Sequence, residues 1–150
     1  MMSSTKGILV PVDFSKGSEQ AVAKAAELAR ALGAPLHLLH VYQVPVLALP
    51  DAAVMASPTF IADLTSRAYA ELQTHQQRLV SQGLKVEIEI TEGVAASTIV
   101  EKANKLDAAM VVMGTHGRSG FQRFLLGSTA ERVVRTSAKP VLTVHLDEGH

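Results

Sequence analysis

Five short apolar runs recur along the chain, at intervals that suit strands alternating with other elements. The run GILVPVD at 7–13 is short and rich in β-branched residues, which is typical of a buried strand. The run KVEIEITEG at 85–93 alternates strictly between apolar and polar positions, which is typical of a strand with one face in water. We predict strands at 7–13, 35–44, 85–93, 107–114 and 139–146.

Longer amphipathic segments separate these runs. In segment 15–33 the apolar residues fall on one helical face, and Gly33 supplies a common helix end. The stretch 45–57 contains two prolines and no clear period, so we expect a loop or a short irregular helix there. We predict helices at 15–33, 58–83, 95–106 and about 128–137.

The order of these elements predicts an α/β fold. Strands that alternate with helices form a parallel sheet with helices on both faces, and right-handed crossovers leave few topologies. The 150 residues suffice for one domain with a core but not for two, so we expect a single domain over 1–150. If the open five-stranded sheet has the order 3-2-1-4-5, its first and fourth strands are neighbours, at the point where Rossmann-like sheets bind ligands.

Composition narrows the classes of function. Hydrophobic residues make up 47% of the chain and charged residues 19%, as expected for a folded domain rather than a disordered chain. Basic and acidic residues balance at 14 each, which argues against a general nucleic-acid binder. The absence of cysteine excludes disulfides and thiolate chemistry. Without a secretory signal or an apolar run of roughly 18 residues, we expect a cytoplasmic protein with no membrane partner.

A glycine-rich stretch, GTHGRSGFQRFLLGST at 114–129, lies between a predicted strand and a predicted helix. Gly114 and Gly117 would let a phosphate approach backbone N–H groups that a Cβ would shield. Gly127 leads into a helix whose first N–H groups lack partners and whose dipole attracts an anion. The hydroxyls of Ser128 and Thr129 would donate to phosphate oxygens, so we expect this loop to hold phosphate.

Positive charge in the loop supports this interpretation, although a simpler one exists. Arg118 and Arg123 lie inside the loop, and Arg118 could contact phosphate through two N–H groups. The simpler interpretation is a capping box, with Ser128 as N-cap and Glu131 three residues later. The stretch is neither the dinucleotide fingerprint nor a P-loop.

An acidic residue at the end of the first strand adds a second part to the site. Asp13 lies at the carboxyl end of that strand, and ligands of open parallel sheets lie beyond the carboxyl ends of the strands. Because a carboxylate repels phosphate, Asp13 suits a ribose hydroxyl or an adenine amine; its alternative role is to cap the first helix. Val41, near the end of the second strand, could line a slot for the base beside Pro11 and Val12.

Two stretches together carry a family resemblance: ILVPVDFSKGSEQAVAKAAELA near the start and VVMGTHGRSGFQRFLLGSTAERVVRTSAKPVLTV near the end. The second contains Gly, two residues, Gly, nine residues, Gly and then Ser. On these residues the chain resembles the universal stress proteins of the UspA superfamily. The resemblance implies an adenine nucleotide alpha hydrolase-like fold with sheet order 3-2-1-4-5, and a homodimer paired through the last strand, 139–146.

The resemblance also implies an ATP site, because members that keep all of these glycines form the ATP-binding branch. Any Mg²⁺ or Mn²⁺ would then be held mainly by the phosphates, since no acidic pair suggests a dedicated metal site. By position, the residues implied to contact the nucleotide are Pro11, Val12, Asp13, Val41, Met113, Gly114, Gly117, Arg118, Gly127, Ser128 and Thr129.

The purpose of the nucleotide stays open between three hypotheses. In the first, the chain is a regulatory module of the stress response that responds to bound ATP. In the second it is a slow ATPase, for which His116 is the candidate base nearest the phosphates; the alternative for His116 is an exposed loop histidine. In the third, the ligand is AMP or a cyclic nucleotide.

The last strand gives a separate reason to expect a dimer. Within this strand, neither face of residues 141–146 carries a formal charge at neutral pH, so as an edge the strand would be poorly protected against pairing with another chain. A second copy of the chain could pair with this edge, or the C-terminal tail or a helix could cover it. The third strand, with its charged residues, is better protected.

Overall fold

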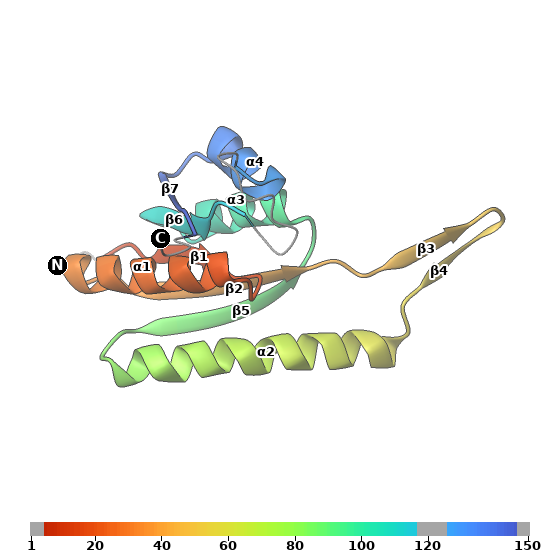
Figure 1. The fold of residues 1–150 in the computed structure, drawn as a ribbon, viewed down its shortest axis with the longest axis horizontal. Coiled ribbons are helices and arrows are strands. Elements are labelled where there is room, and N and C mark those ends of the chain that lie inside the picture. The colour runs from red at the N-terminus through yellow and green to blue at the C-terminus, as the bar shows by residue number, and fades with distance from the viewer. Residues whose placement is uncertain (1–4, 117–125, 147–150) are drawn as a thin grey trace.

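The computed structural model describes residues 5–116 and 126–146 of the chain (Figure 1). In chain order its elements are β1 (Ile8–Pro11), α1 (Lys16–Leu32), β2 (Leu36–Tyr42), β3 (Val46–Leu49), β4 (Ala52–Met55), α2 (Pro58–Ser81), β5 (Val86–Glu92), α3 (Ala95–Lys105), β6 (Met110–Gly114), α4 (Ser128–Thr136) and β7 (Val141–Val144).

The main sheet has five parallel strands in the order β5-β2-β1-β6-β7. Counting the strands of this sheet alone, that order is the predicted 3-2-1-4-5, so the predicted fold is confirmed. In the middle of the sheet, Ile8 of β1 stands beside Leu36 of β2 on one side and Met110 of β6 on the other.

Each face of the sheet has its own hydrophobic core. On one face, α1 and α2 pack over a cluster that contains Ile8 and Val10; on the other, α3 and α4 pack over a cluster that contains Leu9. Figure 1 shows these two pairs of helices on opposite sides of the strands. Because successive strand residues point to opposite faces, three consecutive apolar residues of β1 supply both cores.

Local signals set the helix ends. The Ser15 hydroxyl accepts a hydrogen bond from the Ser18 N–H and caps α1, and Gly33 ends that helix in the left-handed conformation. Ser57 caps α2 in the same way, followed by Pro58 at the first helical position. None of the helices in the described ranges is long and apolar enough to span a membrane.

The expectation of a loop or irregular helix at 45–57 is wrong. This stretch forms an antiparallel hairpin, in which β3 and β4 pair from Val46 with Met55 to Leu49 with Ala52 around a turn at Pro50 and Asp51. Both faces of the hairpin are apolar, so the sequence lacks the alternation that marks a strand with one wet face. Figure 1 shows the hairpin projecting away from the sheet and its helices.

Candidate functional site

Most of the predicted site residues that the structure describes lie at the carboxyl ends of the strands, where β1, β2 and β6 end and α4 begins. Beyond the end of β1, the Val12 N–H donates to the Leu39 carbonyl oxygen of β2 at 2.8 Å. Beyond the end of β6, the Thr115 carbonyl oxygen accepts a hydrogen bond from the Gly127 N–H at 2.6 Å. The two halves of the predicted site are thereby attached to neighbouring strands.

Asp13 holds the residue that caps α1, and is not the cap itself. Its Oδ1 accepts from the Ser15 N–H at 3.0 Å and from the Ser15 hydroxyl at 2.5 Å. The alternative of Asp13 as helix cap is therefore wrong, because Ser15 has that role. Its second oxygen, Oδ2, has no hydrogen bond from the residues that the structure describes, and the side chain is half-buried.

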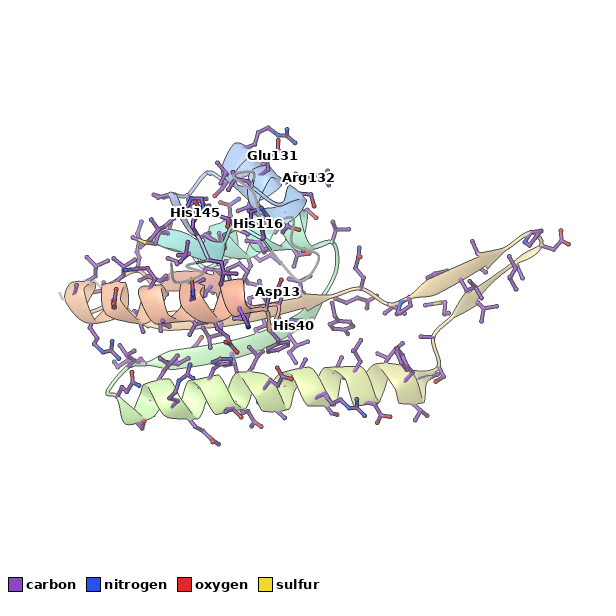
Figure 2. The ribbon with its side chains drawn as sticks, viewed as in Figure 1. Asp13, His40, His116, Glu131, Arg132 and His145 are labelled. Atoms are coloured by element: carbon purple, nitrogen blue, oxygen red, sulfur yellow. The ribbon has the colours of Figure 1, made fainter. Side chains whose placement is uncertain are left out.

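His40 supports the backbone on the other side of Asp13 (Figure 2). Its Nδ1–H donates to the Val12 carbonyl oxygen at 2.7 Å, and its ring lies 4.7 Å from that of Phe14, centroid to centroid. Phe14 has a φ of 65°, an uncommon conformation for a residue with a bulky side chain. Sequence reasoning missed His40, because its partner is a carbonyl group that only the pairing of β1 with β2 brings near.

The structure separates Val12 from the other apolar residues of the predicted site. The Val12 side chain is buried in the core under α1 and α2, and both its backbone polar groups are hydrogen bonded within the protein. Val41 and Met113 pack with the opposite core, under α3 and α4. Pro11 shares their face, since it lies one residue before Val12 along the strand. A slot formed by side chains on that face would exclude Val12.

The glycines of the site hold three backbone segments close together. A Cβ built on Gly114 would lie 3.0 Å from the carbonyl carbon of Gly17, in the first turn of α1. A Cβ on Gly17 would lie 2.9 Å from the His116 carbonyl oxygen, and one on Gly127 would lie 2.9 Å from that of Thr115. Packing between backbones is thus a reason for Gly114 and Gly127 that sequence reasoning did not consider. Gly17 itself was missed, although a glycine early in an alanine-rich helix was a visible signal.

The start of α4 does not form the capping box considered as the simpler alternative. Gly127 occupies the N-cap position, Ser128 is the first helical residue, and among the described residues no side chain caps this end. Glu131 makes the first bond of the helix, from its N–H to the Gly127 carbonyl oxygen. The N–H groups of residues 128–130 therefore have no acceptor within the helix, as at any helix start. Ser128 is exposed and Thr129 half-buried, so both hydroxyls lie at an end that favours anions.

His116 is not an exposed loop histidine. It is half-buried, its Nδ1 lies 3.1 Å from the Thr115 hydroxyl oxygen, and its Nε2 is buried without a hydrogen-bond partner in the described part of the chain. The ring also flanks Gly127, where a Cβ would lie 3.8 Å from the His116 Cδ2. His116 therefore packs between the end of β6 and the start of α4 (Figure 2).

Two predicted residues, Gly117 and Arg118, lie outside the described residues, as does Arg123. Within residues 5–116 and 126–146, no group of three or more His, Cys, Asp or Glu side chains is arranged to hold a metal ion.

Comparison with known proteins supplies the family. The universal stress protein family model matches residues 4–145. The chain belongs to the universal stress protein family. Over 141 residues it is 36% identical to universal stress protein MJ0531 of Methanocaldococcus jannaschii, a match that covers 93% of this chain and 81% of that protein.

Solved structures of universal stress proteins share the fold. Protein MJ0577 of M. jannaschii matches with a TM-score of 0.80 at 26% identity, over 98% of this chain and 100% of the other. A universal stress protein in complex with cAMP matches with a TM-score of 0.71 at 27% identity, over 97% of this chain and 100% of the other. The universal stress protein of Archaeoglobus fulgidus in complex with dAMP matches with a TM-score of 0.68 at 25% identity, over 94% of this chain and 98% of the other. These relatives include proteins that bind adenine nucleotides.

Proposed function

We propose that this universal stress protein binds ATP where β1 and β6 end, and that occupancy of the site regulates its role in the stress response. One observation carries the proposal. The first N–H groups of α4, which have no acceptor within the helix, and the exposed Ser128 hydroxyl lie next to the end of β6, and β6 pairs with β1, the strand that leads to Asp13. An anion-binding end and a separate carboxylate suit the two ends of a nucleotide. The complexes of relatives with cAMP and dAMP support an adenine nucleotide in particular.

Each end of the nucleotide has its own set of residues in this proposal. Asp13 Oδ2 accepts a hydrogen bond from the ribose or the adenine amine, while Oδ1 stays on Ser15. Pro11, Val41 and Met113 supply apolar surface from one face of the sheet. Gly117 and Arg118, with the start of α4, hold the phosphates, which bind any Mg²⁺ or Mn²⁺.

Ser128→Ala tests the phosphate end without disturbing the fold. Because Gly127, and not Ser128, is the N-cap of α4, we expect a stability loss under about 0.5 kcal/mol. Loss of a hydrogen bond to a charged phosphate should weaken ATP binding by about 1–2 kcal/mol, measured by isothermal titration calorimetry. Arg135→Ala, on the exposed last turn of α4, serves as the control and should bind ATP normally.

The same titration with AMP and cyclic AMP distinguishes the nucleotides. ATP should bind more tightly than either, and Ser128→Ala should narrow that difference, because this residue acts on the phosphates. Tighter binding of AMP or cyclic AMP by the unaltered protein would contradict the choice of ATP. Identifying the nucleotide that heat-denatured protein releases provides an independent check.

ATP hydrolysis is a weaker candidate function. A general base must reach the attacking water, whereas Nε2 of His116 is buried and its Nδ1 faces the Thr115 hydroxyl. Asp13 is assigned to the other end of the nucleotide. Phosphate release approaching about 1 s⁻¹, the low end for ordinary enzymes, would contradict a purely regulatory role.

We also propose a homodimer that pairs through β7. This strand forms one edge of the main sheet, and Leu142 is 39% exposed on it. An apolar edge strand of this kind is open to pairing with another chain. The family resemblance supports the same interface.

A further inference from the structure

The β3–β4 hairpin, residues 46–55, is an apolar arm. Its large side chains on both faces, those of Val46, Leu47, Leu49, Val54 and Met55, are between 49% and 63% exposed. The pairing places Leu47 and Val54 on one face, and Val46 and Met55 on the other. Such a surface is unusual for a region that only meets water.

The arm also lacks support from the rest of the chain. Its two strands form a separate two-stranded sheet, which pairs with no strand of the main sheet in the described residues. Figure 1 shows the arm extending away from the sheet and beyond the start of α2. A two-stranded hairpin alone is marginally stable in water, so a surface that covers the arm would complete it.

A second apolar surface lies at the base of the arm, on α2. The buried residues of this helix begin at Ala68, so its first ten residues, 58–67, place none in the core. Phe60 is 51% exposed and Leu64 37%, and they lie one turn apart on the same side of the helix. We call residues 58–67 the α2 overhang, because Figure 1 shows this end of α2 extending past β5.

Charge restricts what covers these two surfaces. Residues 31–66 contain no lysine or arginine, and the acidic residues in that range are Asp51 and Asp63. Anionic membranes and nucleic acids are recognised through basic residues, so neither suits the arm. The arm and the overhang instead match each other, since both are apolar and nearly uncharged.

We propose that a second copy of this chain covers the arm, with the hairpin of each protomer lying along the α2 overhang of its partner. The arm points away from its own overhang, so exchange between two copies satisfies both surfaces at once. Such an exchange uses the same two surfaces on each protomer and closes around a two-fold axis. It joins copies through the hairpin and α2, at the opposite edge of the main sheet from β7.

Cross-linking between single-cysteine variants tests the arrangement, because the natural chain has no cysteine. Ala53→Cys marks the arm, and Arg67→Cys marks the side of α2 that carries Phe60, two turns further on. The two variants carry tags of different size and are mixed with a short bismaleimide. A mixed product, in which one Ala53→Cys chain is joined to one Arg67→Cys chain, supports the proposal. Products that join two arms alone, or no product above the level of unmixed controls, overturn it.

Surface variants show whether the apolar contacts carry the association. Leu47→Ser with Val54→Ser should weaken it by at least about 100-fold and abolish the mixed product, because four apolar side chains per dimer are lost. Leu32→Ser with Val94→Ser, at comparably exposed apolar sites outside the arm, should leave the product unchanged. Circular dichroism verifies that each variant is folded. If both double variants lose the mixed product equally, the proposal is overturned. It is also overturned if the unaltered protein floats with neutral phosphatidylcholine vesicles and only the Leu47→Ser, Val54→Ser variant does not, because the arm would then bind a membrane.

Discussion

Gly17 shows how a single missing side chain connects distant parts of the site. Its Cα hydrogen faces the His116 carbonyl oxygen, and its backbone lies against Gly114. The loop that carries Asp13 leads into the helix containing Gly17, while the segment after β6 leads toward α4. The spacing between the two proposed ends of the nucleotide therefore depends on this glycine contact.

Gly17→Ala should destabilise the protein and weaken nucleotide binding. Alanine normally stabilises a helix by about 1 kcal/mol relative to glycine, but here its Cβ would meet a backbone oxygen at 2.9 Å. We expect a net loss of about 1–3 kcal/mol in the free energy of unfolding, measured with urea, and weaker ATP binding. Gly33→Ala is the control: strained by its φ of 65° but far from the site, it should lose stability and keep its affinity. Normal affinity in folded Gly17→Ala would contradict the proposed link.

His116→Asn separates a structural role from a catalytic one. Asparagine keeps a polar atom near Thr115 and removes the buried Nε2 that has no partner in the described residues. Removing such an atom relieves a desolvation cost of about 1–3 kcal/mol, which offsets the lost packing. We expect a change in unfolding free energy within about 1 kcal/mol and no change in phosphate release from ATP. A selective fall in phosphate release would identify His116 as the base.

Single residues of the site were predictable where chain position alone decides their place. Asp13 lies two residues after the end of β1, so recognising the strand placed it at the carboxyl ends of the strands. The packing of Gly17 and His116, and the hydrogen bond of His40, depend on contacts between segments far apart in the sequence. The predicted start of the last helix at residue 128 is correct; the alternative of a capping box with Ser128 as N-cap is wrong, because the backbone makes Gly127 the cap.

At the scale of elements, a polar cluster ties the edge strand β5 to β2 and α3. Glu89 on β5 receives hydrogen bonds from His37 at 2.9 Å, Lys102 at 2.6 Å and Thr91 at 3.1 Å. Glu87 lies 3.5 Å from the other ring nitrogen of His37. Burial raises the pKa of Glu89, but the hydrogen bonds from Lys102, His37 and Thr91 outweigh it, so the pKa lies below its ordinary value of 4.5.

Glu89→Gln should reduce stability in a pH-dependent way. A carboxyl whose pKa is lowered by folding stabilises the folded state above its unfolded pKa, and this contribution is lost as the pH falls through the folded value. We expect a loss of about 1–2 kcal/mol at neutral pH, shrinking below pH 4.5. Urea unfolding at several pH values measures this, with Glu92→Gln on the same strand as control. If the unfolding free energy of Glu89→Gln falls below pH 4.5 as steeply as that of the unaltered protein, the polar cluster is not the cause of this pH dependence.

The elements themselves were predictable in proportion to the strength of their periodicity. The helices and the strands of the main sheet carry clear apolar patterns and common end signals, and all were located. The β3–β4 hairpin was missed because its side chains are apolar on both faces. Its pairing around Pro50 and Asp51 follows from contacts across the turn, which a search for periodicity does not detect.

At the scale of the whole molecule, handedness left few possible sheet orders, and the family resemblance supplied the one that the structure has. The sequence also indicated that the last strand lacks the charges that protect an edge. What it could not indicate is how copies of the chain meet, because two separate apolar surfaces are available. These are the β7 edge and the hairpin with its α2 overhang, at opposite edges of the sheet.

Thr143→Pro should disrupt pairing through β7 and leave the protomer intact. The Val111 N–H donates to the Pro140 carbonyl oxygen at 2.8 Å, and the Thr115 N–H donates to that of Val144 at 3.2 Å. Even-numbered residues of this strand therefore direct their backbone groups toward β6. Because these groups alternate along a strand, the Thr143 N–H points to the open edge. Proline there removes a donor from that edge and keeps the bonds to β6. We expect sedimentation velocity to show loss of the β7 association with ATP affinity retained.

Leu142→Pro is the matched control, because it removes an N–H that faces β6 and should destabilise the fold by about 3 kcal/mol or more. The mixed product of the Ala53→Cys and Arg67→Cys chains should persist in the Thr143→Pro background, since the arm exchange uses the other edge of the sheet. If both interfaces form, the unaltered chain associates beyond a dimer, and Thr143→Pro reduces it to arm-exchanged dimers. An unchanged mass for Thr143→Pro would show that β7 is not an interface and that any dimer depends on the arms.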